Sequence, residues 1–171
     1  MKYGIAVFPD KKVQEAADRL RTRHDPHHAL IPAHMTVREA EPWAEEKLSA
    51  AITHLEAVSN ALSPFTITFN RVSSFFPVSH VLYMALEDPS PMVRLHQSIC
   101  TGPLALEAQR YVYTPHVTLA QQLTADEIYD LYSNWRLNKV NLTTTIDRII
   151  LLQQSEKGTW KEHRTFELKK P

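Results

Sequence analysis

Pro32-Ala33-His34-Met35-Thr36-Val37 is a short stretch in which a histidine follows a proline closely and precedes a threonine by two positions. The same pattern returns in Thr114-Pro115-His116-Val117-Thr118-Leu119. An apolar residue flanks each His-x-Thr motif on both sides. The two histidines lie 82 residues apart, close to half of the 171-residue chain.

Side chains in a β-strand alternate between the two faces with a period of two. If both segments are strands, His34 and Thr36 point to one face, and His116 and Thr118 also share a face. Each motif then presents one imidazole and one hydroxyl. Two such surfaces facing each other would place two acid/base groups and two hydroxyl donors around a small anion. The pattern therefore predicts a site for phosphodiester chemistry that needs no metal ion.

Composition and charge limit the class of protein. The length fits one domain with a sizeable apolar core, and 43% apolar and 22% charged residues are ordinary globular values. Lysine plus arginine and aspartate plus glutamate number 19 each, so the net charge is zero with histidine neutral. A protein that coats long nucleic acid usually has a basic surface. We therefore expect no extended nucleic-acid surface, whereas a nucleotide or an RNA end remains compatible.

The expected location is the cytoplasm. The single cysteine, Cys100, cannot form an internal disulfide and fits a reducing compartment. No apolar run approaches the roughly 20 residues that span a membrane, so no membrane partner is expected. The three glycines form no phosphate-binding loop or dinucleotide fingerprint, and no cofactor is expected.

Apolar spacing predicts a mixed order of strands and helices. Strands are expected at about 3–8, 33–38, 65–70, 81–86, 115–120, 144–154 and 159–168. Helices are expected after Asp10, over 43–62, from Ser90-Pro91, and after the capping box that begins at Thr124. In each half, a helix leads to a His-x-Thr strand, then another helix and a hairpin. This repeat predicts an α+β fold with pseudo-twofold symmetry, in which two antiparallel sheets flank a central cleft.

The paired motifs and the repeated order resemble the 2H phosphoesterase superfamily, and within it the YjcG-like bacterial phosphoesterases. The resemblance covers nearly the whole chain and includes the N-terminal Met-Lys-Tyr-Gly-Ile strand. It implies a single domain over residues 1–171 with two lobes around a cleft, with one motif (34–36 and 116–118) in each lobe. It also implies metal-independent chemistry at His34, Thr36, His116 and Thr118.

The chemistry of these residues agrees with that implication. Hydrolysis of a cyclic phosphodiester needs a base to activate water and an acid to protonate the leaving oxygen. Histidine titrates near neutral pH, and threonine hydroxyls can donate hydrogen bonds to phosphate oxygens. The family's usual description makes His34 the proton donor and His116 the proton acceptor. Since the motifs are nearly symmetrical, the order could reverse with another substrate.

Several other residues allow two interpretations. Arg38 lies two positions after Thr36 and so shares a strand face with His34 and Thr36. It could therefore enter the cleft and bind phosphate, or it could be a solvated strand end. The histidines at 24, 27 and 28 could indicate a metal site, but they lack a suitable carboxylate or cysteine and favour a polar loop. The aromatic residues at 111, 113 and 160 (Tyr111, Tyr113 and Trp160) could stack on a base or simply belong to the core. Phe75-Phe76-Pro77 resembles an exposed hairpin tip that could line the mouth of the cleft.

Three function classes stay open. The first is a hydrolase acting on a cyclic or 2′-linked phosphodiester of a nucleotide or RNA end. The second is a 2′–5′ RNA ligase that uses the same site. The third is a non-catalytic protein that binds RNA ends. The sequence names neither the substrate nor the oligomeric state.

Overall fold

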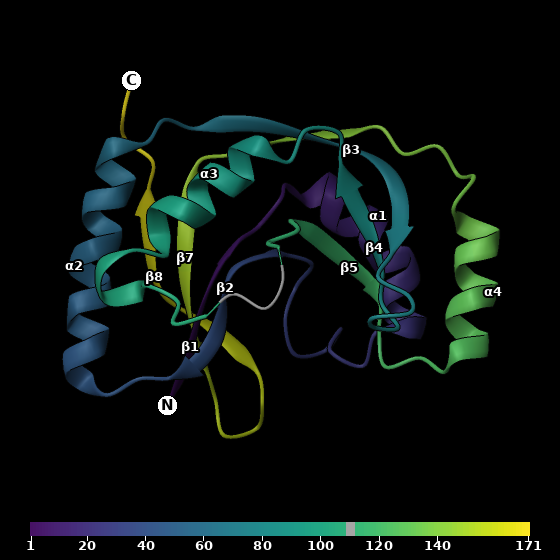
Figure 1. Cartoon of the computed structure of the whole chain (residues 1–171), viewed down its shortest axis with the longest axis horizontal. Coiled ribbons are helices and arrows are strands. Elements are labelled where there is room, and N and C mark those ends of the chain that lie inside the picture. The colour runs from purple at the N-terminus through teal and green to yellow at the C-terminus, as the bar shows by residue number, and fades with distance from the viewer. Residues whose placement is uncertain (109–111) are drawn as a thin grey trace.

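The computed structural model describes residues 1–108 and 112–171 as an α+β fold built on two four-stranded antiparallel sheets (Figure 1). The fold class expected from the sequence is confirmed. The strands are β1 (Lys2–Val7), β2 (Met35–Pro42), β3 (Phe65–Ser74), β4 (Leu82–Leu86), β5 (His116–Ala120), β6 (Leu142–Ile146), β7 (Arg148–Gln154) and β8 (Trp160–Glu167). The helices are α1 (Lys11–His24), α2 (Glu45–Ala61), α3 (Ser90–Ile99) and α4 (Ala125–Trp135), with a 3-10 turn η1 (Gly102–Leu104).

Two helices begin at the caps that the sequence predicts. The Asp10 carboxylate accepts a hydrogen bond from the backbone N–H of Val13 at 3.1 Å and starts α1. Thr124 and Glu127 form a reciprocal capping box at the start of α4. These caps fix where the chain turns from the preceding strand into each helix.

The two sheets have equivalent strand orders. The first sheet runs β2-β1-β7-β8 and the second runs β5-β4-β3-β6. In each, a motif strand occupies one edge, and its neighbour is the strand that comes before it in the chain. The edge strands β2 and β5 contact each other, so the two sheets meet at their motif strands. This arrangement brings together segments that lie half a chain apart.

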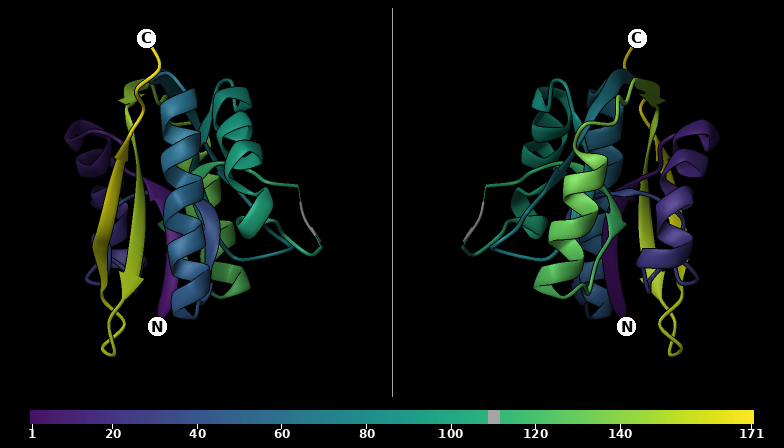
Figure 2. Two further views of the ribbon diagram at one scale, coloured as in Figure 1. Left: turned by 90° about the vertical axis from the view of Figure 1, so that its left-hand side faces the viewer. Right: turned by 90° about the vertical axis from the view of Figure 1, so that its right-hand side faces the viewer.

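The helices are exchanged between the sheets. Helix α1 connects β1 to β2 of the first sheet but packs against β5 and β6 of the second. Helix α3 connects β4 to β5 of the second sheet but packs against β2 of the first. By contrast, α2 packs on the first sheet and α4 on the second, and the two side views show them foremost on opposite sides (Figure 2). The exchange of α1 and α3 ties the two sheets into one structure.

The expected strand at 144–154 is wrong in one respect, because it is two strands in different sheets. β6 belongs to the second sheet and β7 to the first. Burial alternates along β6, where Thr144 and Ile146 are buried, whereas the four successive residues 149–152 of β7 are all buried. The chain crosses from one sheet to the other at Asp147, and burial of one face of β6 is followed by burial of both faces of β7.

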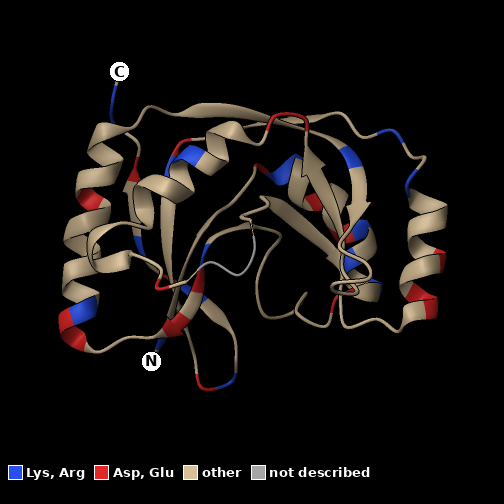
Figure 3. Ribbon diagram, viewed as in Figure 1, with Lys and Arg blue, Asp and Glu red and all other residues tan. Residues whose placement is uncertain are grey.

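Basic and acidic positions are interspersed along the chain (Figure 3), which agrees with the equal numbers of each. Among residues 1–108 and 112–171, no helix is long and apolar enough to cross a membrane.

Candidate active site

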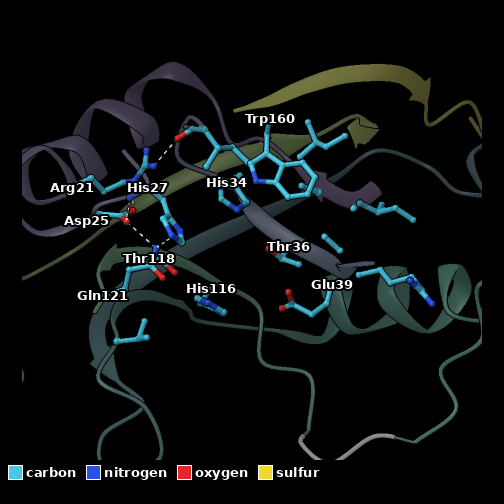
Figure 4. Close-up of a pocket in the computed structure, with 18 of the residues that line it drawn as sticks. Arg21, Asp25, His27, His34, Thr36, Glu39, His116, Thr118, Gln121 and Trp160 are labelled. Atoms are coloured by element: carbon cyan, nitrogen blue, oxygen red, sulfur yellow. Dashed lines mark hydrogen bonds and ion pairs between the residues drawn. The ribbon is translucent and has the colours of Figure 1, made fainter. Parts of the chain in front are cut away.

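A cavity of about 410 Å³ lies where β2 and β5 meet, and both His-x-Thr motifs line it (Figure 4). His34 comes directly before β2, and His116 is the first residue of β5. Thr36 and Thr118 follow on the same faces as their histidines, as the strand parity predicts. The volume suits a small organic ligand. The structure thus brings together the four motif residues that the sequence singles out.

The two imidazoles are held in the same way. His34 Nδ1 lies 2.9 Å from the carbonyl oxygen of Pro32, and His116 Nδ1 lies 2.8 Å from that of Thr114. A carbonyl oxygen can only accept a hydrogen bond, so Nδ1 carries the proton in both rings. Nε2 of each neutral ring therefore keeps its lone pair, and it is the nitrogen available for proton transfer in the cavity.

Burial changes the acid strength of both rings. Removal from water lowers the pKa of His34 to about 4, although its bond to the Pro32 carbonyl opposes the shift. The positive charge of Arg21 and the proximity of His116 lower the pKa of His34 further, whereas Asp25 raises it. Burial also lowers the pKa of His116, against its bond to the Thr114 carbonyl. Without a bound anion, the two rings are accordingly poised as neutral bases at pH 7.

Aromatic side chains fix the ring of His116. Phe75 and Tyr83 each contact it edge to face, with ring centroids 5.0 and 5.3 Å away. Phe75 lines the cavity, so the cleft-lining role considered for it is the correct interpretation. On the other side of the cavity, the ring centroid of Phe8 lies 6.1 Å from that of His34.

The remaining aromatic candidates have different positions relative to the cavity. Trp160 at the start of β8 lines the cavity. Tyr113 instead stacks on His96 at 4.0 Å and donates its hydroxyl hydrogen to the carbonyl oxygen of Thr36 at 2.8 Å. It therefore supports the motif strand, and the base-stacking interpretation of Tyr113 is wrong. Tyr111 lies outside the described residues.

The hydroxyls of the two motif threonines face the cavity. In the described part of the chain, neither Thr36 nor Thr118 uses its hydroxyl in a hydrogen bond. Both side chains are half-buried at the cavity wall. Each can therefore donate a hydrogen bond to a bound anion.

Arg38 fits neither of its two interpretations fully. It lines the cavity but is only 4% exposed, so it is no solvated strand end. Its guanidinium donates to the carbonyl oxygen of Leu104 at 3.0 Å and pairs with Glu41 at 3.0 Å. These contacts use Nε and Nη2, so the protein partly engages the charge of Arg38, and phosphate binding by this residue stays a prediction.

The cavity also contains residues that sequence reasoning missed. Arg21, Asp25, His27 and Gln121 line its polar end. The sequence contained one indication for Arg21, which falls on the apolar face of α1 one turn after Ala17. A buried arginine at such a position needs a charged or polar partner. Gln121 carried no such signal, since it follows β5 as an ordinary polar residue.

The histidines at 24, 27 and 28 have different surroundings in the structure. His24 ends α1 rather than belonging to the loop, and His28 lies 3.9 Å from Asp18. Across residues 1–108 and 112–171, no group of three or more histidine, cysteine, aspartate or glutamate side chains is placed to hold a metal ion. Cys100 is half-buried, and its sulfur lies 3.5 Å from His96 Nδ1.

The chain belongs to the family described as the 2′-5′ RNA ligase superfamily, which matches residues 8–158. The resemblance to the 2H phosphoesterases is thereby confirmed. A Bacillus licheniformis relative named "Putative phosphoesterase" is 39% identical over 166 residues, covering 97% of this chain and 98% of the relative. A Bacillus cytotoxicus relative with the same name is 38% identical over 170 residues, covering 99% and 98%.

Solved structures share the fold. The Escherichia coli LigT structure in complex with 3′-AMP matches with a TM-score of 0.75 at 15% identity, over 99% of this chain and 98% of LigT. The structure of TT0787 from Thermus thermophilus matches with a TM-score of 0.71 at 19% identity, over 99% and 98%. At these identities the similarity concerns the fold alone.

Proposed function

We propose that this chain is a metal-independent phosphoesterase that hydrolyses a cyclic or 2′-linked phosphodiester of a nucleotide or RNA end. One observation carries the proposal. His34 and His116 are anchored identically through Nδ1, so each leaves Nε2 for the same small cavity. Two proton-transfer groups on either side of one phosphate are what the hydrolysis requires.

The reaction follows from these atoms. Nε2 of one neutral ring accepts a proton from water as the water oxygen bonds to phosphorus. The bond between phosphorus and the leaving oxygen breaks, and that oxygen takes a proton from Nε2 of the other ring. A bound phosphodiester carries a negative charge, which raises the pKa of both rings and so makes a protonated partner accessible at neutral pH. Thr36 and Thr118 donate hydrogen bonds to the non-bridging oxygens, where charge increases.

The assignment of His34 as donor and His116 as acceptor follows the family's usual description. Because both rings donate from Nδ1 to a backbone carbonyl oxygen, the two histidines have the same tautomer. A substrate bound in the opposite direction would therefore reverse the roles. The relatives named as phosphoesterases and the structures of LigT complexed with 3′-AMP and with phosphate support a phosphate-containing nucleotide as the ligand class.

The test is a panel of 2′,3′- and 3′,5′-cyclic nucleotides, ADP-ribose cyclic phosphate and cyclic-phosphate RNA oligomers, each assayed with EDTA present. We expect turnover of at least one 2′,3′-cyclic or 2′-linked substrate, lost in both single histidine variants. Activity that disappears in EDTA and returns with zinc or manganese would contradict the proposal.

The family's description also favours a second candidate, a 2′–5′ RNA ligase that runs the same proton transfers in reverse. Incubation of cyclic-phosphate and 5′-hydroxyl RNA ends would then give a joined product resistant to 3′–5′ nucleases. If RNA ends bound without hydrolysis or joining, the chain would be a non-catalytic RNA-end binding protein instead.

A further inference from the structure

A third histidine, His27, lines the polar end of the cavity together with Arg21, Asp25 and Gln121. We call these four residues the His27 network. Figure 4 shows the His27 ring between Asp25 and His34, on the side of the cavity where Thr118 lies. His27 comes from the turn after α1, and Gln121 directly follows β5. The network therefore joins segments next to both motifs.

The network rests on a buried ion pair. Asp25, whose side chain is 2% exposed, accepts hydrogen bonds from Arg21 Nε at 3.1 Å and Gln121 Nε2 at 2.8 Å. The backbone N–H of His27 donates to the same carboxylate at 2.9 Å. Arg21 also donates to the carbonyl oxygen of Ile31 at 2.7 Å, three residues before His34. A buried charge with this many partners holds a fixed geometry.

These contacts set the tautomer of His27. The Gln121 amide nitrogen has two hydrogens, and one points to the carboxylate of Asp25, which can only accept. The same nitrogen lies 3.1 Å from His27 Nδ1, so its second hydrogen is donated to that ring nitrogen. Nδ1 must then be the acceptor, and the proton of the neutral ring is on Nε2. His27 thus has the tautomer opposite to that of His34 and His116.

The backbone beside the network is strained. Gln122 has a φ of 56°, in the left-handed region that residues other than glycine seldom adopt. The amide nitrogen of its exposed side chain lies 3.2 Å from His27 Nε2. An amide nitrogen cannot accept the hydrogen on Nε2, so the Gln122 amide has to turn its oxygen toward the ring when Nε2 carries the proton. This exposed side chain can rotate, so it can also give way to an oxygen of a substrate.

We propose that His27 is a third substrate-contacting imidazole, which donates an Nε2–H hydrogen bond to a phosphate oxygen beside Thr118. The proposal rests on the proposed function, because it takes the phosphate to lie between His34 and His116. His27 acts as a fixed donor, whereas the other two rings offer a lone pair. Gln121 and Asp25 are positioning residues, since they act only through the orientation of His27.

Two substitutions separate this role from a purely structural one. In His27→Asn, the amide oxygen replaces Nδ1 and keeps the contact to Gln121, but the donor at Nε2 is lost. In His27→Gln, the longer side chain places an amide nitrogen near the Nε2 position, but the contact to Gln121 is lost. His28→Ala is the matched control, because it removes the neighbouring histidine, which does not line the cavity.

We expect His27→Asn to lower kcat/KM by about 10- to 100-fold at every pH, with the shape of the pH profile unchanged, and His27→Gln to stay within about fivefold of wild type. A structural role predicts the reverse order, and that result would overturn the proposal, as would wild-type activity in both variants.

Affinity for inorganic phosphate, measured by titration calorimetry, gives a readout independent of turnover. The proposal predicts the same order of variants for phosphate affinity. His27→Asn should bind phosphate most weakly, and His28→Ala should bind it as tightly as the wild-type protein. If no substrate turned over but this order held, the proposed function would fail and the role of His27 would stand. If His34→Ala abolished turnover while both His27 variants bound phosphate like wild type, the function would stand and the role of His27 would fail. No phosphate binding by the wild-type protein, together with no turnover of any substrate in the panel, would overturn both.

Discussion

His34 and His116 lie 82 residues apart in the sequence, yet each donates a hydrogen bond from Nδ1 to the carbonyl oxygen two positions earlier, at 2.9 and 2.8 Å. The contact is local, so each ring brings its own anchor from the motif that contains it. Because the anchor fixes the tautomer, both Nε2 atoms are presented to the cavity as proton acceptors. The contact between β2 and β5 then brings the two rings to the same cavity.

Removal of either imidazole should stop catalysis without unfolding the protein. We expect His34→Asn and His116→Asn to lower kcat by about 10²–10⁴-fold, because the asparagine amide can keep the bond to the backbone carbonyl but cannot replace Nε2. Steady-state kinetics and thermal unfolding measure the two effects. The double variant should be little worse than the poorer single one, since acid and base act as one unit. Near wild-type turnover in both single variants would place the site elsewhere.

The motif threonines should contribute less than the histidines. Thr36→Val and Thr118→Val keep the shape of the side chain and its preference for a strand but remove a hydroxyl donor. We expect kcat to fall by about 10–10³-fold in each, with KM for the substrate changed less, because the phosphate oxygens gain charge in the transition state. Thr36→Ser and Thr118→Ser serve as controls that restore the donor. If serine and valine variants lost equal activity, the hydroxyl would not be the functional group.

The buried imidazoles should make the protein less stable in acid. The pKa of His34 is about 4 in the folded protein and near 6.5 in the unfolded chain. Between these values the unfolded chain binds more protons, so the free energy of unfolding falls as pH decreases from about 6.5 to about 4 and levels off below. The loss from His34 is on the order of 3 kcal/mol, and the lowered pKa of His116 adds to it.

Urea unfolding at pH 7, 5.5 and 4.5 measures this dependence. In His34→Asn the titrating group is absent, so the decrease in stability over this range should be smaller than in wild type. Inorganic phosphate should reduce the decrease in the wild-type protein, because a bound anion raises the pKa of both rings. An identical pH dependence in wild type and variant would show that the loss arises from other groups.

Much of the fold was predictable because the signals are local. The caps at Asp10 and Thr124 and the alternation along β3 depend on residues a few positions apart. The motif histidines and threonines were predictable for the same reason, since a strand's period places them on one face. What could not be predicted was which sheet each strand joins. The crossing between sheets at Asp147 has no clear sequence signal, because apolar residues occupy the four successive positions 149–152 that follow it.

The polar end of the cavity was not predictable from the sequence. Asp25 and Gln121 lie 96 residues apart and meet only because α1 packs against the opposite sheet. Arg38 lies on the cavity side as its strand position predicts, but its contacts to the Leu104 carbonyl oxygen and to Glu41 were not predictable. Parity predicts which face a side chain occupies, whereas its partners depend on tertiary contacts.

Trp160 should recognise the base of a nucleotide substrate rather than its phosphate. Its side chain lines the cavity and packs on the small apolar cluster of Ala6, Ile31, Ile150 and Leu152. We expect Trp160→Leu to raise KM for a 2′,3′-cyclic nucleotide by about 5- to 100-fold, the usual range for loss of one base–aromatic stack. Affinity for inorganic phosphate should stay unchanged, because the phosphate has no ring to stack.

Two control variants accompany Trp160→Leu. Trp160→Phe keeps a flat ring and should recover most of the loss. Tyr129→Ala removes an exposed aromatic side chain on α4, away from the cavity. Equal losses of nucleotide and phosphate affinity in Trp160→Leu would instead mean that Trp160 only supports the structure of the cavity.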